Sequence, residues 1–374
     1  MVLDKAYWMA LAHLPKMTVS RKNNIIIRCY ESDLSISDLY KLDNNDLKNT
    51  LSMNESEIEL FNKSKSELSN YSFIAEDLLD QGYNIIPITS SEYSPTMKKN
   101  MKKRHSPPLI YTKGNQKIMQ EDSTAVVGSR KAGKTSLDFT DNIAKKASKE
   151  FKVIVSGFAK GVDKQALLSA LKYKGQSIIV LPQGILTFSS GLKKYYKQIV
   201  QGDVLVLSAF HPKAPWSVNL AMARNPIIYG LAKNIYVAES NKKGGTWSGV
   251  NDGLKKGRKI YVRKPENNEK NANEILIKNG AVPVDKEGNI TDIEKDKIAD
   301  KTGKEMIETE KKIIDLLKKG EFTSKYIVDK LKLDWKSQQV TSFLKGQEDV
   351  KIVKEKPLQF THKESIAESQ EKLF

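Results

Sequence analysis

The sequence predicts an α/β protein with a Rossmann-like, mostly parallel sheet at its core, a helical N-terminal domain and a C-terminal winged-helix domain. Two observations carry this prediction. Between about residues 120 and 263, short Val- and Ile-rich runs alternate with amphipathic stretches. On either side of that region the pattern is mainly helical. The predicted divisions are a helical domain (1–80), a Rossmann-like domain (81–285), a linker (286–305), a winged helix (306–361) and a disordered tail (362–374).

The first 80 residues read as short helices joined by polar turns rich in Asn, Ser, Asp and Lys. Apart from the apolar run at 25–27, nothing in them suggests a strand. The last of these helices, which begins near residue 69, is expected to end near Gln81-Gly82, because glycine is a common stop signal. A strand is expected at 83–88, where the central region begins.

The central region contains six apolar runs of four to six residues that are mostly continuous rather than alternating. Continuous runs are typical of strands that are buried on both faces, as in a parallel sheet. Amphipathic helices are expected between them, one with Phe139, Ile143 and Ala147 on one stripe and the next with Val162 and Ala166. The runs lie at 124–128, 153–157, 177–182, 204–208, 235–240 and 259–263.

The C-terminal stretch 306–361 has three helical patterns and then "DVKIVKEKPLQF", which could form two short strands. Three helices and a hairpin outline a winged helix, a domain that often inserts its third helix into DNA. Here that helix carries only Lys336 and Lys345 as bases, so a protein-binding role is equally compatible with the pattern.

The composition points to a polyanionic partner. The 374 residues include 62 Lys and Arg against 45 Asp and Glu, a net charge of +17 and a pI near 9.5. Such a surplus favours nucleic acid or an anionic membrane surface. A membrane is not favoured, because there is no apolar run near 18 residues and no basic leader before the apolar N-terminal stretch.

The few cysteines and histidines narrow the chemistry further. The single cysteine, Cys29, suits a reducing cytosol, so we expect a cytoplasmic protein. Four scattered histidines and one cysteine cannot form a zinc site at the usual ligand spacings. A zinc site is therefore not expected, and although carboxylates could still hold a magnesium ion, we predict no metal and no cofactor.

The stretch Gly128-Ser129-Arg130-Lys131-Ala132-Gly133-Lys134-Thr135 matches G-x-x-x-x-G-K-[ST], the phosphate loop of ATP- and GTP-hydrolysing proteins. Such enzymes also need an acid at the end of another strand to hold magnesium, and only Glu239 is available. Arg130 and Lys131 stand in mid-loop, where small residues would let the backbone wrap a phosphate. A nucleotide-binding ATPase remains an alternative that the sequence does not favour.

A second glycine cluster follows the next predicted strand. Ser156, Gly157 and Gly161 lie on the turn with Lys160, and Asp163 stands in the first turn of the following helix. Glycine lets backbone amides approach a phosphate, and a helix N-terminus adds partial positive charge. Because the first two strands of such a sheet commonly lie side by side, both loops are expected to open at the same edge, where open α/β sheets bind ligands.

Two further segments are expected at that edge. Arg224 and Asn225 precede Pro226, which is a favourable first residue for a helix. Gly244, Gly245 and Thr246 form a turn after the strand at 235–240, and the helix that follows points free N–H groups at an anion. Four loops with glycine or basic residues suggest several phosphates in a row, which a polynucleotide backbone supplies.

Taken together, these segments resemble the DprA/Smf family of DNA-processing proteins over about residues 70–285. Departures at Ala209, Pro226 and 264–265 indicate a divergent member. On this resemblance Lys134 and Thr135 complete the phosphate-loop match by coincidence. The counterparts of the family's ordered motifs are "EYSPTMKKNMKKRHSPPLIYTKGN", "VVGSRKAG", "VSGFAKGVD", "LSAFHP", "ARNPII", "GGTWSG" and "KKGRKIYV".

The resemblance implies a non-catalytic protein that binds single-stranded DNA, forms a homodimer and delivers DNA to a RecA-type recombinase during DNA processing, uptake or recombination. A basic residue after the third strand is also implied, either Lys193 or Lys194. By position, the implied DNA-binding residues are Gly128, Ser129 and Arg130 on one wall, Ser156, Gly157, Ala159, Lys160, Gly161 and Asp163 on the next, and Arg224 and Asn225 beyond.

Two points stay open. Rossmann-like enzymes that cleave nucleotide N-glycosidic bonds carry a related glycine loop, of which "KKGGTWSGVND" is a weak echo. They need a carboxylate on the next helix, but Gly249 stands at that position and Asp252 follows one turn later. A nucleotide hydrolase or nucleotide-ligand sensor, for instance in phage defence, is thus a second alternative. Trp216 could either pack in the loop or stack on a base.

Overall fold

The computed structural model describes residues 2–102, 104–266, 269–291, 308–333, 335, 337–347, 349–355 and 358–362. The chain divides into two compact units, Met1–Thr291 and Asp292–Phe374. None of the helices described is both long and apolar enough to span a bilayer. The predicted division at residue 80 within the first unit stays a prediction.

The first unit is built on a nine-stranded sheet with the order β1-β2-β6-β5-β4-β3-β7-β8-β9. β1 and β2 pair antiparallel, as do β2 and β6, and every pair from β6 to β9 is parallel. The predicted Rossmann-like, mostly parallel α/β core is confirmed. The strands are β1 (Asn84–Pro87), β2 (Leu109–Lys113), β3 (Ser123–Gly128), β4 (Val153–Ser156), β5 (Ser177–Val180), β6 (Val204–Ser208), β7 (Asn234–Glu239), β8 (Ile260–Arg263) and β9 (Val282–Val284).

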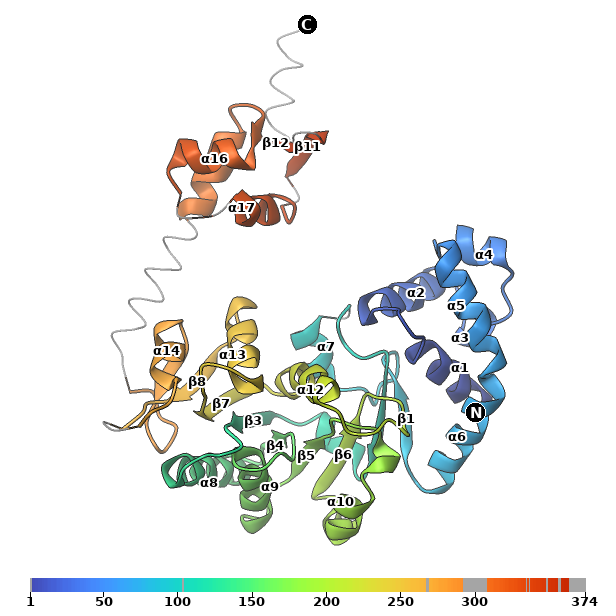
Figure 1. Ribbon diagram of the computed structural model, residues 1–374, viewed down its shortest axis with the longest axis vertical. Helices are drawn as coiled ribbons and strands as arrows, with labels where there is room; N and C mark the ends of the chain where they lie inside the picture. The colour runs from blue at the N-terminus through green and yellow to red at the C-terminus, as the bar shows by residue number, and fades with distance from the viewer. Residues whose placement is uncertain are drawn as a thin grey trace, which may run out of the picture. The chain divides into compact units, whose positions relative to one another are not determined.

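Helices cover both faces of this sheet, with α8 (Lys134–Lys149) and α9 (Val162–Lys172) on one face and α12 (Val218–Leu231) and α13 (Gly245–Lys255) on the other (Figure 1). Successive residues of a strand point to opposite faces, so both faces of β3 are apolar. Val126 packs in the cluster that contains Phe139 and Ile143 of α8, whereas Ala125 and Val127 join the larger cluster on the other face.

The strand order reverses at β3. From β3 the chain adds β4, β5 and β6 on one side, and then crosses back to place β7, β8 and β9 on the other. The carboxyl ends of β3 and β7 therefore diverge into loops that leave a crevice between them. In open α/β sheets this topological switch point is where ligands bind.

The N-terminal helices lie beside the edge strand β1, with α6 against it (Figure 1). Four of these helices are capped at their start, because the side chains of Thr18, Ser35, Asp43 and Asn54 each accept a backbone N–H at the third residue that follows. α6 ends at Asp80, as the predicted stop at Gln81-Gly82 requires. The bounds are α1 (Val2–Ala12), α2 (Val19–Glu31), α3 (Ile36–Leu39), α4 (Asn44–Asn49), α5 (Glu55–Ser66) and α6 (Leu68–Asp80).

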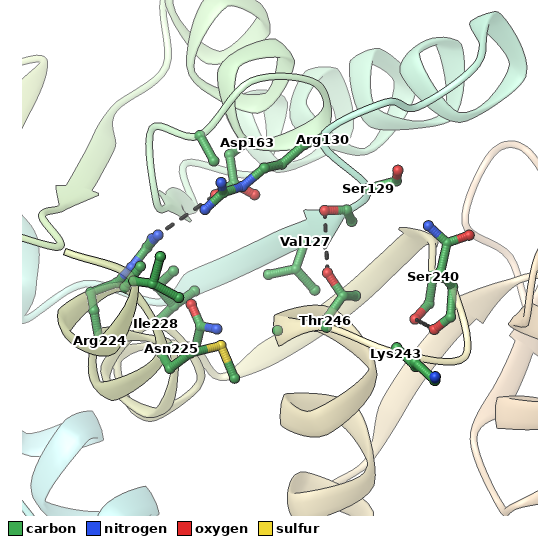
Figure 2. Close-up of a pocket in the computed structure, with 18 of the residues that line it drawn as sticks. Val127, Ser129, Arg130, Asp163, Arg224, Asn225, Ile228, Ser240, Lys243 and Thr246 are labelled. Carbon is green, nitrogen blue, oxygen red and sulfur yellow. Dashed lines mark hydrogen bonds and ion pairs between the residues drawn. The ribbon is translucent and has the colours of Figure 1, made fainter. Parts of the chain in front are cut away.

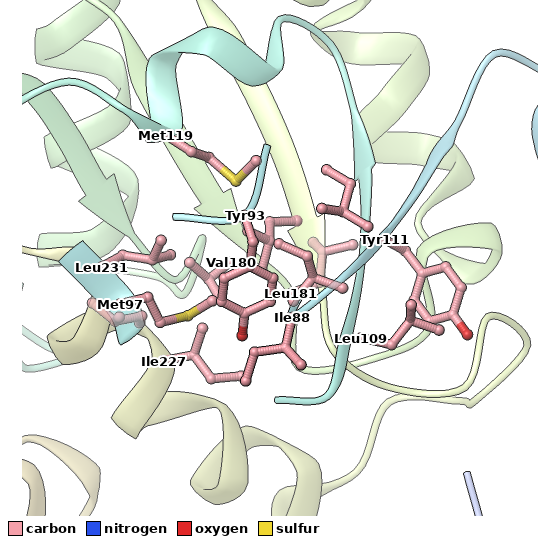
Figure 3. Packing of buried hydrophobic residues seen from close by; sticks show 14 of the residues in the cluster. Ile88, Tyr93, Met97, Leu109, Tyr111, Met119, Val180, Leu181, Ile227 and Leu231 are labelled. Carbon is pink, nitrogen blue, oxygen red and sulfur yellow. The ribbon is translucent and has the colours of Figure 1, made fainter. Parts of the chain in front are cut away.

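An apolar cluster joins α12 to the β1–β2 region (Figure 3). Met97 of α7 (Pro95–Met101) lies beside Ile227 and Leu231 of α12, and Tyr93 is buried next to them. Burial raises the pKa of Tyr93 well above its ordinary value, and its hydroxyl donates to the Pro107 carbonyl at 2.8 Å. The remaining short elements are the 3₁₀ turns Gln116–Met119 and Ile185–Thr187, α10 (Ser189–Lys194), α11 (Tyr196–Gln201) and α14 (Asn273–Lys278).

The helix expected to begin at Pro226 begins eight residues earlier, so that prediction is wrong. α12 starts at Val218, where the Ser217 hydroxyl accepts the N–H of Leu220 at 3.1 Å, and Pro226 lies inside the helix. A proline inside a helix loses one backbone hydrogen bond, but here buried residues on both sides of it hold the helix together. Arg224 and Asn225 are therefore on a helix rather than in a loop.

The second unit contains a helical segment at 308–317, then β10 (Phe322–Thr323), α16 (Ser324–Leu331), α17 (Ser337–Leu344), β11 (Val350–Glu355) and β12 (Leu358–His362). Its three strands form an antiparallel sheet in the order β10-β12-β11. The winged-helix assignment stays a prediction. β12 includes His362, the first residue of the predicted tail, whereas 363–374 and linker residues 292–305 lie outside the described residues.

Candidate functional site

A cavity of about 460 Å³ opens at the carboxyl ends of β3, β4 and β7 (Figure 2). We call it the switch-point cleft. Loops 128–131 and 240–246 form two of its walls, and α12 forms the third. Its lining residues are Val127, Gly128, Ser129, Arg130, Lys131, Ala159, Asp163, Trp216, Val218, Ala221, Met222, Arg224, Asn225, Ile228, Tyr229, Ser240, Asn241, Lys243, Gly244, Gly245 and Thr246.

Arg224 lies at the base of the switch-point cleft with only 3% of its surface exposed. Its Nε and Nη1 have no hydrogen-bond partner among the described residues. The nearest acid is Asp163, whose Oδ2 is 3.9 Å from Nη1, a distance for ion pairing but not for a hydrogen bond (Figure 2). A buried guanidinium with unused donors is a site for an anion.

Burial acts on both partners of this pair. It lowers the pKa of Arg224, which the Asp163 charge partly offsets. It also raises the pKa of Asp163, against the opposing effect of the Arg224 charge and of backbone N–H groups at 157 and 159. Each charge thus supports the other in a place where an unpaired charge is costly.

Exposed bases at the mouth give the switch-point cleft an excess of positive charge. Arg130 and Lys131 follow β3, and Lys243 follows β7. The whole surplus of the chain is concentrated in this part: residues 81–285 contain 34 Lys and Arg against 14 Asp and Glu, whereas residues 1–80 contain 9 against 13. The cleft thus lies in a strongly cationic region that attracts anions.

The loops after β3 and β4 are held together through Gly161. It has φ +75, and a Cβ there would lie 2.3 Å from the Ser129 carbonyl oxygen. The same oxygen accepts the N–H of Val162 at 3.3 Å, while the Ser156 hydroxyl donates to the Asp163 carbonyl at 3.0 Å. Glycine is required at 161 because the two backbones approach closely at a positive φ.

A hydrogen bond connects loop 240–246 to loop 128–131. The Thr246 hydroxyl donates to the Gly128 carbonyl at 3.2 Å, which ties the start of α13 to the end of β3 (Figure 2). Gly244 has φ +100, a conformation that side chains rarely adopt, and it precedes the first turn of α13. The N-terminus of α13 therefore faces the switch-point cleft with its unpaired backbone N–H groups.

The phosphate-loop match has a different role from that of an NTPase loop. The Glu239 carboxylate accepts the N–H of Gly133 at 3.3 Å and the hydroxyl of Ser136 at 2.9 Å. Arg263, 1% exposed, donates to that Ser136 hydroxyl at 3.1 Å and pairs with Glu269 at 2.5 Å. A carboxylate thus lies where a phosphate loop would hold its anion, and Glu239 caps α8 instead of remaining free for magnesium.

The structure brings together ten of the sixteen predicted site residues. Three of the others, Ser156, Gly157 and Gly161, lie beneath the lining and support it. Lys160 is exposed outside the lining, and Lys193 and Lys194 are exposed on α10. The ten that line the cleft are Gly128, Ser129, Arg130, Ala159, Asp163, Arg224, Asn225, Gly244, Gly245 and Thr246.

Sequence reasoning missed Lys243, Val218, Met222 and Tyr229, and it left Trp216 open. Lys243 stands next to the Gly-Gly turn, so its position could have been noticed. Met222 and Tyr229 could not, because placing them requires the knowledge that α12 continues through Pro226. Asp252, weighed as a hydrolase acid, does not line the switch-point cleft and pairs with Lys256 at 2.7 Å.

The described residues contain no group of three or more His, Cys, Asp and Glu side chains that could hold a metal ion. The polar groups that converge on the switch-point cleft are guanidinium, ammonium, amide, hydroxyl and backbone N–H groups, with Asp163 as the only buried acid in the lining. Such a set binds anionic oxygen and is poorly suited to a cation.

Comparison with known proteins gives a consistent picture. The family model described as DNA recombination-mediator protein A matches residues 84–294. A DNA processing protein DprA from Streptococcus pneumoniae is 32% identical over 42% of this chain and 55% of its own, and one from Bacillus subtilis is 26% identical over 49% and 61%. The matched segments thus span little more than half the length of those relatives.

A solved structure of DNA processing protein A from Streptococcus pneumoniae superposes with a TM-score of 0.61 at 24% identity. The match covers 76% of this chain and 95% of that one. At this level of identity the similarity establishes the fold.

Proposed function

The chain belongs to the DNA recombination-mediator protein A family, and on that premise we propose that it binds single-stranded DNA by holding backbone phosphates in the switch-point cleft. The observation that carries this proposal is the buried Arg224, whose unused donors lie at the base of a cavity with a cationic mouth. Phosphate is the anion of nucleic acids, and a strand offers several in succession.

The binding mechanism is electrostatic. Arg130, Lys131 and Lys243 neutralise phosphates at the mouth, while the Arg224 guanidinium holds one at the base. Backbone N–H groups at the start of α13 fix the path of the strand without reading its sequence. Each neutralised phosphate releases counterions, so affinity falls as salt rises.

The bases have an apolar surface available on the α12 side. Trp216, Val218 and Met222 line the cleft and are 50%, 65% and 44% exposed, which is unusual for such side chains. Aromatic stacking tolerates every base because each has a π-face. An exposed indole beside a cationic cleft favours single strands, whose bases are free to stack, over a duplex.

The wider proposal follows the family. We infer a non-catalytic DNA-processing protein of the cytoplasm that acts as a homodimer and passes bound single strands to a RecA-type recombinase. The match to relatives named DNA processing protein DprA supports the DNA-processing part of this proposal. The winged-helix identity of the second unit belongs to the same proposal. The α8 cap formed by Glu239 argues against an ATPase.

The test is fluorescence anisotropy of a labelled oligo-dT over a salt series, with an ATPase assay on the same preparation. Binding that weakens steeply with salt, without ATP turnover, is the expected result. DNA-stimulated ATP hydrolysis that is lost in Lys134→Ala would overturn it and restore the phosphate-loop alternative.

A further inference from the structure

The segment between β6 and α12 connects the N-terminal helices to the switch-point cleft. We call residues 209–217 the 209–217 loop. It begins at the end of β6, next to β2, and it ends at Ser217, which caps α12. Trp216, the residue before that cap, lines the cleft and is 50% exposed. The loop therefore ends at the surface that is proposed to stack on the bases.

The imidazole of His211 is the contact between this loop and the N-terminal helices. It meets the ring of His13, just after α1, edge-on at 5.3 Å between centroids, and the ring of Tyr71 on α6 at 5.9 Å. Such separations and tilts are those of favourable aromatic pairs. His13 in turn stacks on Tyr71 and Tyr111, and its Nε2 lies 2.7 Å from the Tyr111 hydroxyl. The His211 side chain is thus held by helices that are distant in the sequence.

The backbone of the 209–217 loop lies against the turn that follows β5. The Gly184 N–H donates to the Ala214 carbonyl at 2.8 Å, and the Leu186 N–H donates to the Pro212 carbonyl at 3.0 Å. A Cβ at 184 would lie 2.2 Å from the Pro212 carbonyl oxygen, so the two backbones are in contact. The His211 carbonyl accepts the N–H of Ala214 at 2.8 Å. Residues 211–214 therefore form a tight turn, through which a displacement of His211 reaches the residues that follow.

The Trp216 indole has no anchor of its own in the part of the chain that the structure describes. It packs in neither hydrophobic cluster of the first unit and stacks on no other ring. Its orientation therefore depends on the backbone that carries it. Ordering a side chain when a ligand binds costs affinity, and a side chain that is already in place avoids this cost. Contacts that order the 209–217 loop thus raise the affinity for DNA without touching it.

The N-terminal helices themselves are poorly placed to bind a strand. None of residues 1–80 lines the switch-point cleft. They also contain 9 Lys and Arg against 13 Asp and Glu, so their net charge repels phosphates. Any contribution of these helices to DNA binding is therefore indirect, and the ring of His211 is a contact that can transmit it.

We propose that His211 is a positioning residue: packed against His13 and Tyr71, it orders the 209–217 loop and so presents Trp216 to the bound strand. This inference rests on the proposed function and gives the N-terminal helices a part in it. The cleft then depends on residues at the start of the chain, although none of them touches DNA.

The test is a double-mutant cycle of His211→Ala and Trp216→Ala, measured as the dissociation constant for labelled oligo-dT by anisotropy. His211→Ala alone is expected to weaken binding about two- to tenfold, the range that corresponds to the loss of an aromatic pair. In the Trp216→Ala background the same change is expected to have almost no further effect, because the side chain that His211 positions is gone. His211→Phe keeps a ring against His13 and Tyr71, and it is expected to bind like wild type.

Tyr71→Ala applies the test from the side of the N-terminal helices. Its loss is expected to weaken binding by a similar factor, again only while Trp216 is present. The slope of log affinity against log salt should not change, because no charge is removed. Phe73→Ala is the matched control, since it removes an aromatic side chain of the same helix that is 70% exposed. Thermal melts show whether each variant is folded at the temperature of the titration.

The outcomes separate this inference from the proposed function. If the losses from His211→Ala and Trp216→Ala add, the effect of His211 does not pass through Trp216 and the inference is wrong. It is also wrong if His211→Ala, Tyr71→Ala or Trp216→Ala binds like wild type, although strand binding then stands. If the wild-type protein does not bind oligo-dT, the proposed function itself fails, and the positioning role falls with it.

Discussion

The Arg224 guanidinium lies directly against the backbone of Gly157, so close that a Cβ at 157 would be 1.4 Å from Nη1. No rotation of a methyl group removes such an overlap, so any residue other than glycine must displace the arginine. The β4 loop and α12 are thereby coupled: the absence of a side chain on one determines the position of the charge on the other.

Gly157→Ala is therefore expected to weaken oligo-dT binding by about 1.5–3 kcal/mol, because it moves a charged donor out of the cleft. Anisotropy measures the affinity, and a thermal melt checks that the variant is folded. Gly133→Ala is the control, because a Cβ at 133 meets nothing within 4 Å. Equal affinity of the two variants would contradict a role for Arg224 in binding.

Arg130→Ala is expected to weaken binding by about 1–3 kcal/mol and to leave the melting temperature unchanged. Arg130 is exposed at the mouth of the cleft, so its removal leaves no buried partner unpaired. If it neutralises one phosphate, the slope of log affinity against log salt should become shallower by about 0.7. Lys319→Ala, at an exposed position in the other unit, serves as the charge-matched control.

Trp216→Ala should lower the affinity for oligo-dT by about 1–3 kcal/mol without a change in the salt slope, because stacking is lost and charge is not. A lower affinity with an unchanged salt slope distinguishes Trp216→Ala from Arg130→Ala, which is expected to change both. Phe73→Ala removes an aromatic side chain that is 70% exposed on α6, and it is expected to bind like wild type. A shallower salt slope in Trp216→Ala would argue that the variant has disturbed the basic residues instead.

Stability is expected to fall as the pH drops below about 6.5. Burial, together with the charges of His211 and Lys22, lowers the pKa of His13 to about 3. In the unfolded chain the pKa of a histidine is near 6.5. Between pH 3 and pH 6.5, therefore, the unfolded chain binds a proton at this histidine and the folded chain does not. The loss at pH 5 is up to about 2 kcal/mol, and the lowered pKa of His211 acts in the same direction.

Urea unfolding at pH 7 and pH 5 measures this effect. His13→Gln should reduce the difference between the two pH values, even if the hydrogen bond of Nε2 with the Tyr111 hydroxyl, 2.7 Å in wild type, is not fully replaced. His105→Gln, at an exposed position, should leave the difference as it is. An unchanged difference in His13→Gln would remove His13 as its source.

Much of the sheet could be predicted because each strand is indicated by the sequence pattern within the strand itself. Continuous apolar runs such as 124–128 and 204–208 identify buried strands, and the glycines after β3 and β4 identify their loops. β2 was missed because its apolar run is short and follows two prolines. Those features give no sign that β1 and β2 extend the sheet antiparallel beyond β6.

The site was harder to predict because several of its contacts depend on distant segments. The residues near Arg224 looked like a loop, since Pro226 resembles a helix start and the real start at Ser217 has an equally ordinary cap. The role of Glu239 depends on β7 lying next to β3, which places its carboxylate at the start of α8. Neither the true start of α12 nor the position of Glu239 beside α8 can be predicted from a short stretch of sequence.

The place of β3 in the sheet also has a consequence for synthesis of the chain. β3 pairs with β4 soon after both have left the ribosome, but its other neighbour is β7, and Thr124 must find Asn234 far along the chain. Non-local pairing of this kind is slow to form. A nascent chain that ends before β7 thus carries the loops 128–131 and 157–163 without the wall that closes them into a cleft. Translation has to pass residue 246 before the protein can hold a strand of DNA in the proposed way.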